Sequence, residues 1–441
     1  MSGRGLSLII TVLVIISTFS LVVTILPENV RAATLYVGGV GPGNFTTIQG
    51  AVEAANPGDA VFVYNGTYVE IVRINKTLTL IGEDRDSTVI NGTGRTPIVI
   101  QADWVNITGF TITYSNNSGI KLTNAQKCHV FNNIVSYTSR GINLYFSNQT
   151  IISDNTLLEN WDHIFLQNSN YNLITNNFAL RRDTAVHLAR SDNNIVSHNN
   201  AVVDYAGVNV EISNNNNISS NNLSESEYGA YVRISNNNTF FNNTISVPGK
   251  AIFLRDSTNM NIVRNTMMGS GILNWGNSLA QRNTHIIDTS NTVNGKPVYH
   301  WKNLTGGKIP PGAGQVIVTN CSDVIIKNQN MNNSSVGINV WYSSNITVVD
   351  NDASWNSMYG ITIAFCTSCT VANNTFNFNQ HHGFTSYFLN DSLVTDNNIS
   401  HNEYGLSLEY SNNTAIANNN ISSTKWFGLN IHASDNCLLT D

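Results

Sequence analysis

Charged side chains are scarce in this sequence, and their scarcity limits what the protein can bind. Lys and Arg number 22 and Asp and Glu number 28 among 441 residues, which gives a net charge of −6. Nucleic-acid binding needs clustered Lys and Arg that neutralise phosphates, and the chain contains no strongly basic block. We therefore expect no nucleic acid among its partners.

Long runs of helix-forming residues are also missing. Thr, Val, Ile, Asn and Gly are abundant instead. β-Branched side chains favour strands, and Asn and Gly favour turns. The composition therefore predicts an all-β protein.

The N-terminus is typical of a targeting segment. Arg4 precedes an almost continuous apolar run from Leu6 to Leu26, and small residues follow near Ala32. This pattern predicts a signal peptide over residues 1–33, although the length of the run also suits an uncleaved membrane anchor. Either reading predicts an exported chain, in the periplasm, at the cell surface or outside the cell. About twenty Asn-x-Ser/Thr sequons agree with an exported glycoprotein.

A repeat of about 22 residues runs through most of the chain, as in solenoid proteins. Each unit starts with a small residue followed by alternating apolar residues. The starts are Gly119, Gly141, His163, Ala185, Gly207, Gly229 and Ala251, and then Gln315, Gly337, Gly360, Gly383, Gly405 and Gly428.

One column of the repeat is almost always asparagine. Its members are Asn133, Asn155, Asn177, Asn199, Asn221, Asn243 and Asn265, followed by Gln329, Asn351, Asn374, Asn397 and Asn419. Stacked coils would place these amides about 4.8 Å apart, so each can donate to the next and accept from the previous one. Such a ladder satisfies buried amides.

The repeat therefore predicts a right-handed parallel β-helix with short strands and no helix within a coil. A leucine-rich repeat shares the period, but it needs Leu-dense units and a helical return segment. The return segments here are short and the apolar residues are mostly β-branched.

After the targeting segment of residues 1–33, the predicted organisation has four parts. Residues 34–96 form an N-terminal cap and the first coils, residues 97–272 form further coils, 273–314 form an insertion, and 315–441 form the last coils. Phe45–Ala55 predicts a capping helix that starts with a Thr46–Gln49 capping box and has one apolar face. Asn294-Gly295 within the insertion predicts a hairpin, which either forms one wall of a groove or is a tolerated excursion. The last unit stops before its ladder Asn, so we expect either a truncated C-terminus or a partner over the open coil.

The chain resembles NosD-like and pectin-methylesterase-like proteins of the pectin-lyase-like class. The resemblance rests on Thr46-Thr47-Ile48-Gln49, Pro57-Gly58-Asp59, Gly66-Thr67-Tyr68 and the Gly-Ile-x-Leu…Asn coils. It implies a β-helix of the carbohydrate-binding and sugar-hydrolase class, and for the NosD family a role in maturation of a copper site. The catalytic signatures that the resemblance would imply for pectin methylesterases and polygalacturonases are missing, and His381-His382-Gly383 is only a superficial echo of them.

Two columns of the repeat should face outward beside the inward Ile-x-Leu pairs. We call eight of their members the strip, and the strip consists of Tyr145, Phe165, His187, Glu211, Tyr231, Arg233, Phe253 and Arg255. Aromatic rings and polar groups in a row suit an extended sugar polymer. Cross-strand ion pairs and stacked rings also stabilise any sheet, so a purely structural role is the alternative.

Catalytic and metal chemistry have weaker support. A glycosidase needs two carboxylates that face one bond, and Glu211 with Asp183 or Asp204 is the conceivable pair. Cys366, Cys369, His381 and His382 form the candidate metal cluster, but Cys366 and Cys321 fall in a column of small residues that is otherwise serine. Buried serine equivalents are the simpler interpretation, so we predict no metal and no cofactor.

The sequence thus favours an exported β-helix protein that binds a polysaccharide or surface glycan along one face. The alternatives are a polysaccharide lyase or glycoside hydrolase, a surface scaffold or adhesin, and a NosD-like copper-site maturation factor.

Overall fold

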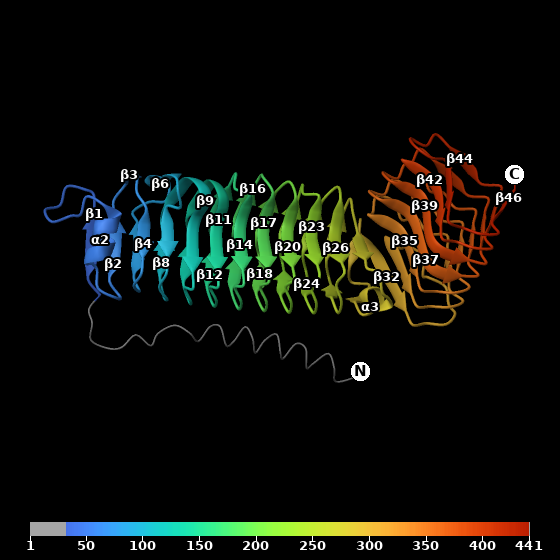
Figure 1. Ribbon diagram of the computed structural model, residues 1–441, viewed down its shortest axis with the longest axis horizontal. Helices are drawn as coiled ribbons and strands as arrows, with labels where there is room; N and C mark the ends of the chain where they lie inside the picture. The colour runs from blue at the N-terminus through green and yellow to red at the C-terminus, as the bar shows by residue number, and fades with distance from the viewer. Residues whose placement is uncertain (1–31, 441) are drawn as a thin grey trace. The chain divides into compact units, whose positions relative to one another are not determined.

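The computed structural model describes residues 32–440. The predicted signal peptide or anchor over residues 1–33 lies almost entirely outside them. The compact unit that begins at Thr34 is a parallel β-helix of short strands joined by turns (Figure 1). Within the described range, no helix has the length and hydropathy that crossing a bilayer requires.

Each early coil contributes one strand to each of three faces. The first face contains β1 (Thr34–Val37), β2 (Ala60–Val63), β5 (Thr79–Gly82), β8 (Asn106–Thr108), β10 (His129–Phe131), β12 (Ile151–Ser153), β15 (Leu173–Thr175), β18 (Ile195–Ser197), β21 (Asn217–Ser219), β24 (Thr239–Phe241), β27 (Asn261–Val263) and β30 (Ile286–Ile287). The second contains β3 (Gly66–Tyr68), β6 (Thr88–Gly94), β13 (Thr156–Leu158), β16 (Phe178–Leu180), β19 (Asn200–Val202), β22 (Asn222–Ser224), β25 (Thr244–Ser246), β28 (Thr266–Met268) and β31 (Thr292–Val293). The third contains β4 (Val72–Ile74), β7 (Ile98–Ile100), β14 (Asp162–Gln167), β17 (Thr184–Ala189), β20 (Ala206–Glu211), β23 (Tyr228–Arg233), β26 (Lys250–Arg255) and β29 (Ile272–Trp275). The long strands β9 (Thr111–Thr123) and β11 (Ile134–Tyr145) run through the second and third faces.

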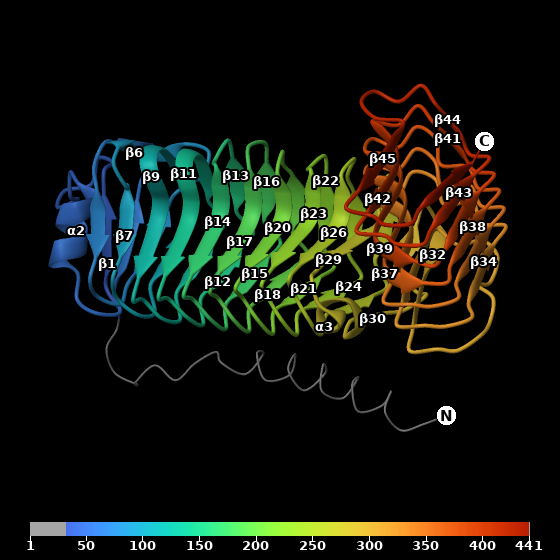
Figure 2. The same ribbon diagram turned by 45° about the vertical axis from the view of Figure 1, so that its right-hand side comes forward.

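A second set of coils follows. It contains β32 (Lys296–Lys302), β33 (Gln315–Thr319), β34 (Ile325–Lys327), β35 (Val336–Trp341), β36 (Thr347–Val349), β37 (Tyr359–Thr367), β38 (Thr370–Ala372), β39 (His382–Asn390), β40 (Leu393–Thr395), β41 (Asn398–Ser400), β42 (Tyr404–Glu409), β43 (Ala415–Ala417), β44 (Asn420–Ser422), β45 (Leu429–His432) and β46 (Leu438–Thr440). We call residues 34–293 the first stack and residues 296–440 the second stack. Figure 2 shows the strands of the second stack running in a different direction from those of the first.

One coil illustrates why the sequence winds this way. Ile152 of β12, Leu157 of β13 and Ile164 of β14 all point inward and are at most 1% exposed. Each pairs in parallel with the same position of the next coil, as Ile152 does with Ile174. The predicted parallel β-helix, with three short strands per coil, is therefore confirmed.

The asparagine ladder is confirmed and makes more bonds than predicted. The Nδ2 of Asn177 donates to Asn199 Oδ1 at 3.0 Å, and also to the carbonyls of Ile152 and Thr175 at 2.9 and 3.0 Å. Its Oδ1 accepts the backbone N–H of Asn155 at 3.1 Å and the Asn155 amide at 3.0 Å. Each rung therefore joins backbone and side chains of successive coils.

A second buried ladder was not predicted. Asn172, Asn194, Asn216 and Asn238 repeat at 22 residues, and the Nδ2 of Asn194 donates to Asn216 Oδ1 at 3.2 Å. The serine column behaves similarly, because the N–H of Cys321 donates to Ser343 Oγ and that of Ser343 to Cys366 Sγ. Cys366 thus takes the serine position, as expected.

The N-terminal helix is present, but its capping partners differ from the prediction. Helix α2 (Ile48–Ala54) buries Ile48, Ala51 and Val52. Its N-cap is Thr47, whose hydroxyl accepts the N–H of Gly50, rather than Thr46. The carboxylate of Glu70, from the coil below, accepts the N–H groups of Ile48 and Gln49 at 2.9 Å each.

The insertion is smaller than its predicted range of 273–314. Residues 272–293 form one more coil of the first stack, in which β29, β30 and β31 pair with β26, β27 and β28. Helix α3 (Leu279–Asn283) lengthens this coil, so its ladder residue Asn291 stands 26 residues after Asn265. The predicted hairpin is present, because β31 and β32 pair antiparallel around Asn294 and Gly295, both with positive φ.

The ladder generates a stability prediction. Asn199→Ala removes hydrogen bonds to buried partners and leaves them without replacement, so we expect a loss of about 2–3 kcal/mol in the free energy of unfolding. Urea denaturation followed by circular dichroism measures it. Asn222→Ala is the matched control, since Asn222 is exposed one coil further along. Equal effects of the two substitutions would contradict a stabilising ladder.

Candidate functional site

The strip lies on the third face of the first stack, and its columns are in register. Phe165 pairs with His187 on adjacent strands, Glu211 with Arg233, and Tyr231 with Phe253. The structure therefore brings the predicted residues together along six successive strands, from β11 to β26.

Two aromatic members are covered, which corrects the expectation that the strip faces outward throughout. Phe165 is 6% exposed, because the guanidinium of Arg140 lies 3.9 Å from its ring centroid. Phe253 is 8% exposed and packs in a cluster with Leu273 and Val336. Tyr145, at 37% exposure, remains accessible.

The charged members form a chain of contacts along the axis. Asp162 Oδ1 lies 3.3 Å from His187 Nδ1, and His187 Nε2 lies 3.9 Å from Glu211 Oε2. Glu211 Oε1 then accepts a hydrogen bond from Arg233 Nη1 at 2.6 Å. All four side chains are partly exposed, and His187 Nε2 has no hydrogen-bond partner. Further along the axis, Arg255 is 51% exposed and its Nε lies 3.8 Å from Asp256.

Asp183 lies near this row of charged contacts and differs from the other carboxyls in its pKa. Burial raises its pKa, and the charge of Asp162 raises it further, while Thr184 and His187 oppose the shift. A carboxyl with a raised pKa therefore lies near the carboxylates of Asp162 and Asp204, and acid and base catalysis of glycoside cleavage uses carboxyl pairs whose pKa values differ.

Aromatic rings gather at the end of the strip nearest the second stack. Tyr231 stacks on Tyr228 and Phe253 with ring centroids 5.1 and 5.3 Å apart. Tyr205 meets Tyr228 edge to face at 5.3 Å. Tyr228 and Phe253 are themselves 5.7 Å apart, so the three rings pack against one another and stabilise the sheet, and the Tyr231 hydroxyl hydrogen-bonds Arg255.

The two stacks meet through side chains that bond backbone groups across the junction. Gln315 is fully buried, and its amide donates to the carbonyls of Ile272 and Val336 while its Oε1 accepts the N–H of Ile272 at 2.9 Å. Ser335 Oγ donates to the carbonyl of Gly271 at 3.0 Å. A Cβ on Gly271 would lie 2.5 Å from Ser334 Oγ, so the close approach requires glycine here.

Titratable groups of the second stack border this junction. Burial lowers the pKa of His382 to about 4 and also lowers that of His381, to which the positive charge of Lys250 contributes. Burial raises the pKa of Tyr359 to about 12. These groups are therefore uncharged at neutral pH, and the two histidine rings stack 4.7 Å apart.

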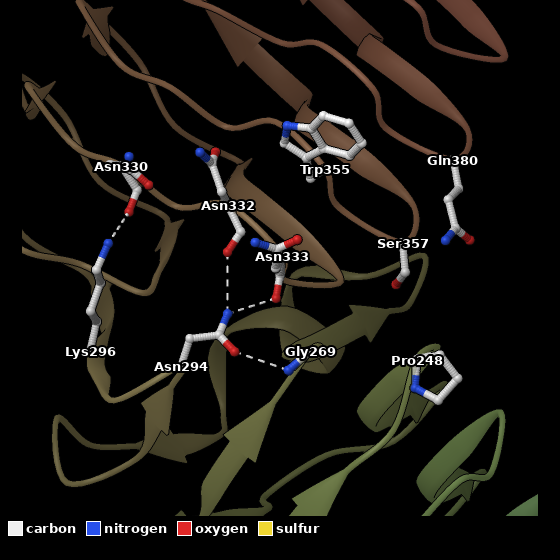
Figure 3. A pocket seen from close by; sticks show the side chains of 10 residues that line it. All are labelled: Pro248, Gly269, Asn294, Lys296, Asn330, Asn332, Asn333, Trp355, Ser357 and Gln380. Atoms are coloured by element: carbon white, nitrogen blue, oxygen red, sulfur yellow. Dashed lines mark hydrogen bonds between the residues drawn. The ribbon is translucent and has the colours of Figure 1, made fainter.

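A groove of about 660 Å³ lies at one corner of the junction (Figure 3). Asn294 and Lys296 of the hairpin form one wall with Pro248 and Gly269. Trp355 belongs to the opposite wall. The remaining lining residues are Asn330, Asn332, Asn333, Ser357 and Gln380. The hairpin within the predicted insertion therefore contributes Asn294 and Lys296 to a groove wall.

The walls of the groove are fixed by hydrogen bonds. Asn294 Nδ2 donates to the carbonyls of Asn332 and Asn333 at 3.2 and 2.8 Å, and its Oδ1 accepts the N–H of Gly269 at 2.9 Å. Lys296 Nζ donates to the carbonyl of Asn330 at 2.9 Å. Sequence reasoning offered the hairpin as one wall of a groove, but it did not identify the opposite wall with Trp355, which comes from a different part of the chain.

This architecture defines a parallel β-helix protein of the NosD-like and pectin-lyase-like class. The chain belongs to the NosD family, whose description is periplasmic copper-binding protein, with matches over residues 52–204, 201–294 and 275–441. A 67-residue segment is 42% identical to a probable pectinesterase 56 of Arabidopsis thaliana. That segment is 14% of this chain and spans 23% of the plant protein.

Solved structures with a similar fold share little sequence with this chain. The Dettilon tailspike protein is 12% identical with a TM-score of 0.46, over 70% of this chain and 62% of that one. An N-terminal fragment of the bacteriophage Phi29 gene product 12 is 12% identical with a TM-score of 0.44, over 89% and 91%. Pectin methylesterase PemA of Erwinia chrysanthemi is 13% identical with a TM-score of 0.35, over 46% and 90%.

The residues present do not fit a copper site. Within residues 32–440, no group of three or more His, Cys, Asp or Glu side chains has the arrangement that a metal ion needs. Cys366 and Cys369 are buried, and burial raises the pKa of the Cys366 thiol well above its usual value, which disfavours the thiolate that binds metals. The Nδ1 atoms of His381 and His382 lie 2.7 Å apart and hydrogen-bond each other, which takes one nitrogen of each ring away from a metal. We derive no chemistry through copper.

Gln315 provides a test of the junction. Gln315→Leu keeps a similar side-chain volume but leaves the N–H and carbonyl of Ile272 unsatisfied, so we expect the free energy of unfolding to fall by about 2–3 kcal/mol. Hydrogen exchange at Ile272 should accelerate in parallel. Gln101→Leu, at an exposed site of the first stack, is the control. Unchanged exchange at Ile272 would show that Gln315 does not hold the stacks together.

Proposed function

We propose that this protein is exported and binds a polysaccharide along the strip of the first stack. One observation supports the proposal most. Asp162, His187, Glu211 and Arg233 come from four successive strands and contact one another in a diagonal row, all partly exposed, and Glu211 and Arg233 are in register. Their spacing of about 4.8 Å per coil lets an extended polymer contact several of them at once.

The chemistry of these groups suits sugar hydroxyls and acidic sugars. Carboxylates accept hydrogen bonds from hydroxyls, and guanidinium groups donate to hydroxyls or carboxylates. Arg255 is the most exposed charged member of the strip, at 51%, and it has donors to spare beyond its contacts with Tyr231 and Asp256. Since Phe165 and Phe253 are covered, we assign recognition to the polar members with Tyr145 and Tyr231, and a supporting role to the two phenylalanines.

Export rests on the N-terminal segment and on the family. The apolar run after Arg4 has the features of a targeting signal, and the family description is periplasmic. A periplasmic or surface location would bring the strip into contact with envelope or environmental glycans.

Glycoside hydrolysis is the second candidate. Asp183 has a raised pKa and lies close enough to Asp162 for their charges to interact. Two neighbouring carboxyls, one of them with a raised pKa, fit the acid and the base or nucleophile of such an enzyme. The short segment similar to a plant pectinesterase is in keeping with polysaccharide as the substrate class.

The strip is tested by affinity electrophoresis of the full-length protein in gels containing polygalacturonate, alginate, xylan or glucan. Arg255→Gln removes a charged donor, so we expect retention by the bound polymer to weaken about tenfold, equivalent to about 1.4 kcal/mol. Arg264→Gln is the matched control, an exposed arginine after β27 on the first face. Stability should change by less than about 1 kcal/mol in both variants, because both charges are exposed.

The result separates the candidate functions. Retention that depends on Arg255 without product release supports a binding protein. Release of oligosaccharides, abolished by Asp183→Asn, would establish the hydrolase instead. Absence of retention by every polymer would refute the proposal and leave a scaffold or a copper-site maturation factor.

A further inference from the structure

The junction groove contains polar groups that the fold leaves unused. Asn294 and Asn332 are fully engaged, since Asn332 donates to Asp352 at 3.0 Å and accepts the N–H of Ser354 at 2.7 Å. The side-chain amides of Asn330, Asn333 and Gln380 have no hydrogen-bond partner among the described residues. The groove thus has a rigid frame and three free amides, each able to donate and to accept.

Trp355 offers an aromatic surface on the same wall. It is 56% exposed, although its ring is held in place by Phe378, 4.2 Å away and tilted by only 9°. Phe378 stacks in turn on His401 at 4.6 Å. Trp355 is the first ring of this series, because the preceding coil has Asn333 at the equivalent position 22 residues earlier. One face of the indole therefore meets Phe378, and Figure 3 shows the ring above Asn332 and Asn333 on the groove wall.

The groove offers little charge to a ligand. Lys296 is its one charged lining residue, and its ammonium already donates to the carbonyl of Asn330. The carboxylate of Asp352 lies behind Asn332 and is engaged by Asn332 and Ser354. An ionised ligand would lose hydration without gaining a counter-charge, whereas an uncharged polar ligand would gain partners for its hydroxyl groups.

We propose that the junction groove binds an uncharged sugar unit of a polysaccharide. The apolar face of the sugar ring stacks on Trp355, and its hydroxyls bond the free amides of Asn330, Asn333 and Gln380. Because Phe378 and the wall bonds hold these groups in position before binding, little side-chain freedom is lost when the sugar enters. The proposal deepens the proposed function, since it adds a neutral-sugar site to a protein that holds a polymer on its strip.

The two sites adjoin each other. Ser357 and Gln380 line the groove, and the next residues in each coil, Met358 and His381, border the end of the strip beside Tyr228 and Lys250. A polymer with both charged and neutral units can therefore engage the strip and the groove together.

The test is isothermal titration of the full-length protein with cellohexaose, mannohexaose, xylohexaose and laminarihexaose. Trp355→Asn removes the ring but keeps a residue that tolerates its left-handed backbone, with φ of 59°. We expect at least a tenfold loss of affinity for whichever hexasaccharide binds. Trp104→Asn is the matched control, because Trp104 is 48% exposed with φ of 60° and lies outside the groove. Gln380→Ala should weaken binding several-fold.

The outcomes distinguish this proposal from the proposed function. If a hexasaccharide binds equally to the wild type and to Trp355→Asn, the neutral-sugar site lies elsewhere and the groove proposal is wrong. If no hexasaccharide binds while acidic polymers are still retained through Arg255, the groove proposal fails and the strip stands. If neither class binds, both proposals fail.

Discussion

The structure depends on the hydrogen bonding of buried side-chain amides. An asparagine inside a protein must satisfy two donors and an acceptor without water, and here each rung does so by bonding the rung and the backbone of neighbouring coils. Coils of 22, 23 and 26 residues all keep the amide in line, as from Asn177 to Asn199, Asn351 to Asn374 and Asn265 to Asn291, so differences in coil length are absorbed elsewhere in the coil. The ladder therefore fixes the coil spacing, and the spacing keeps outward residues such as Glu211 and Arg233 in register.

The interruption of the ladder creates the junction between the two stacks, where the groove lies. The first ladder ends at Asn291, and a new one starts at Gln329, whose Oε1 accepts the N–H of Ala313. The first apolar core extends to Val298 and Ile317 of the second stack, another core fills the rest of that stack, and a small third cluster contains Phe253 and Val336. Because the coils change direction at this junction, residues of distant coils form facing walls, and the groove arises there rather than on the regular surface.

The regular coils could be predicted from the sequence because their pattern repeats with a constant period. The coil with Asn291 was missed because α3 lengthens it to a spacing of 26 residues, which hides its amide from a search at 22. The capping partners of helix α2 could not be predicted from the local sequence, because Glu70, which accepts N–H groups at the helix N-terminus, comes from another coil.

The candidate site also depends on contacts between residues that are distant in sequence, and these contacts could not be predicted. Alternation along a strand predicts which side a residue faces, and the strip residues do lie in their columns. Exposure depends on other parts of the chain: Arg140 covers Phe165 from the neighbouring coil, and Val336 meets Phe253 across the junction. The Asn294-Gly295 hairpin was readable from its turn residues, but nothing in the sequence places Trp355 opposite it.

The identical stacking of the coils also makes the molecule a ruler. Loss or gain of one 22-residue unit between Gly141 and Ala251 would preserve every ladder bond, because each rung bonds its neighbours in the same way. Such a change would alter the separation between the charged residues of β14 and the junction by a single step of about 4.8 Å. Relatives that differ by whole coils would therefore measure different lengths of polymer between two unaltered ends, and evolution could adjust ligand length without redesigning either end.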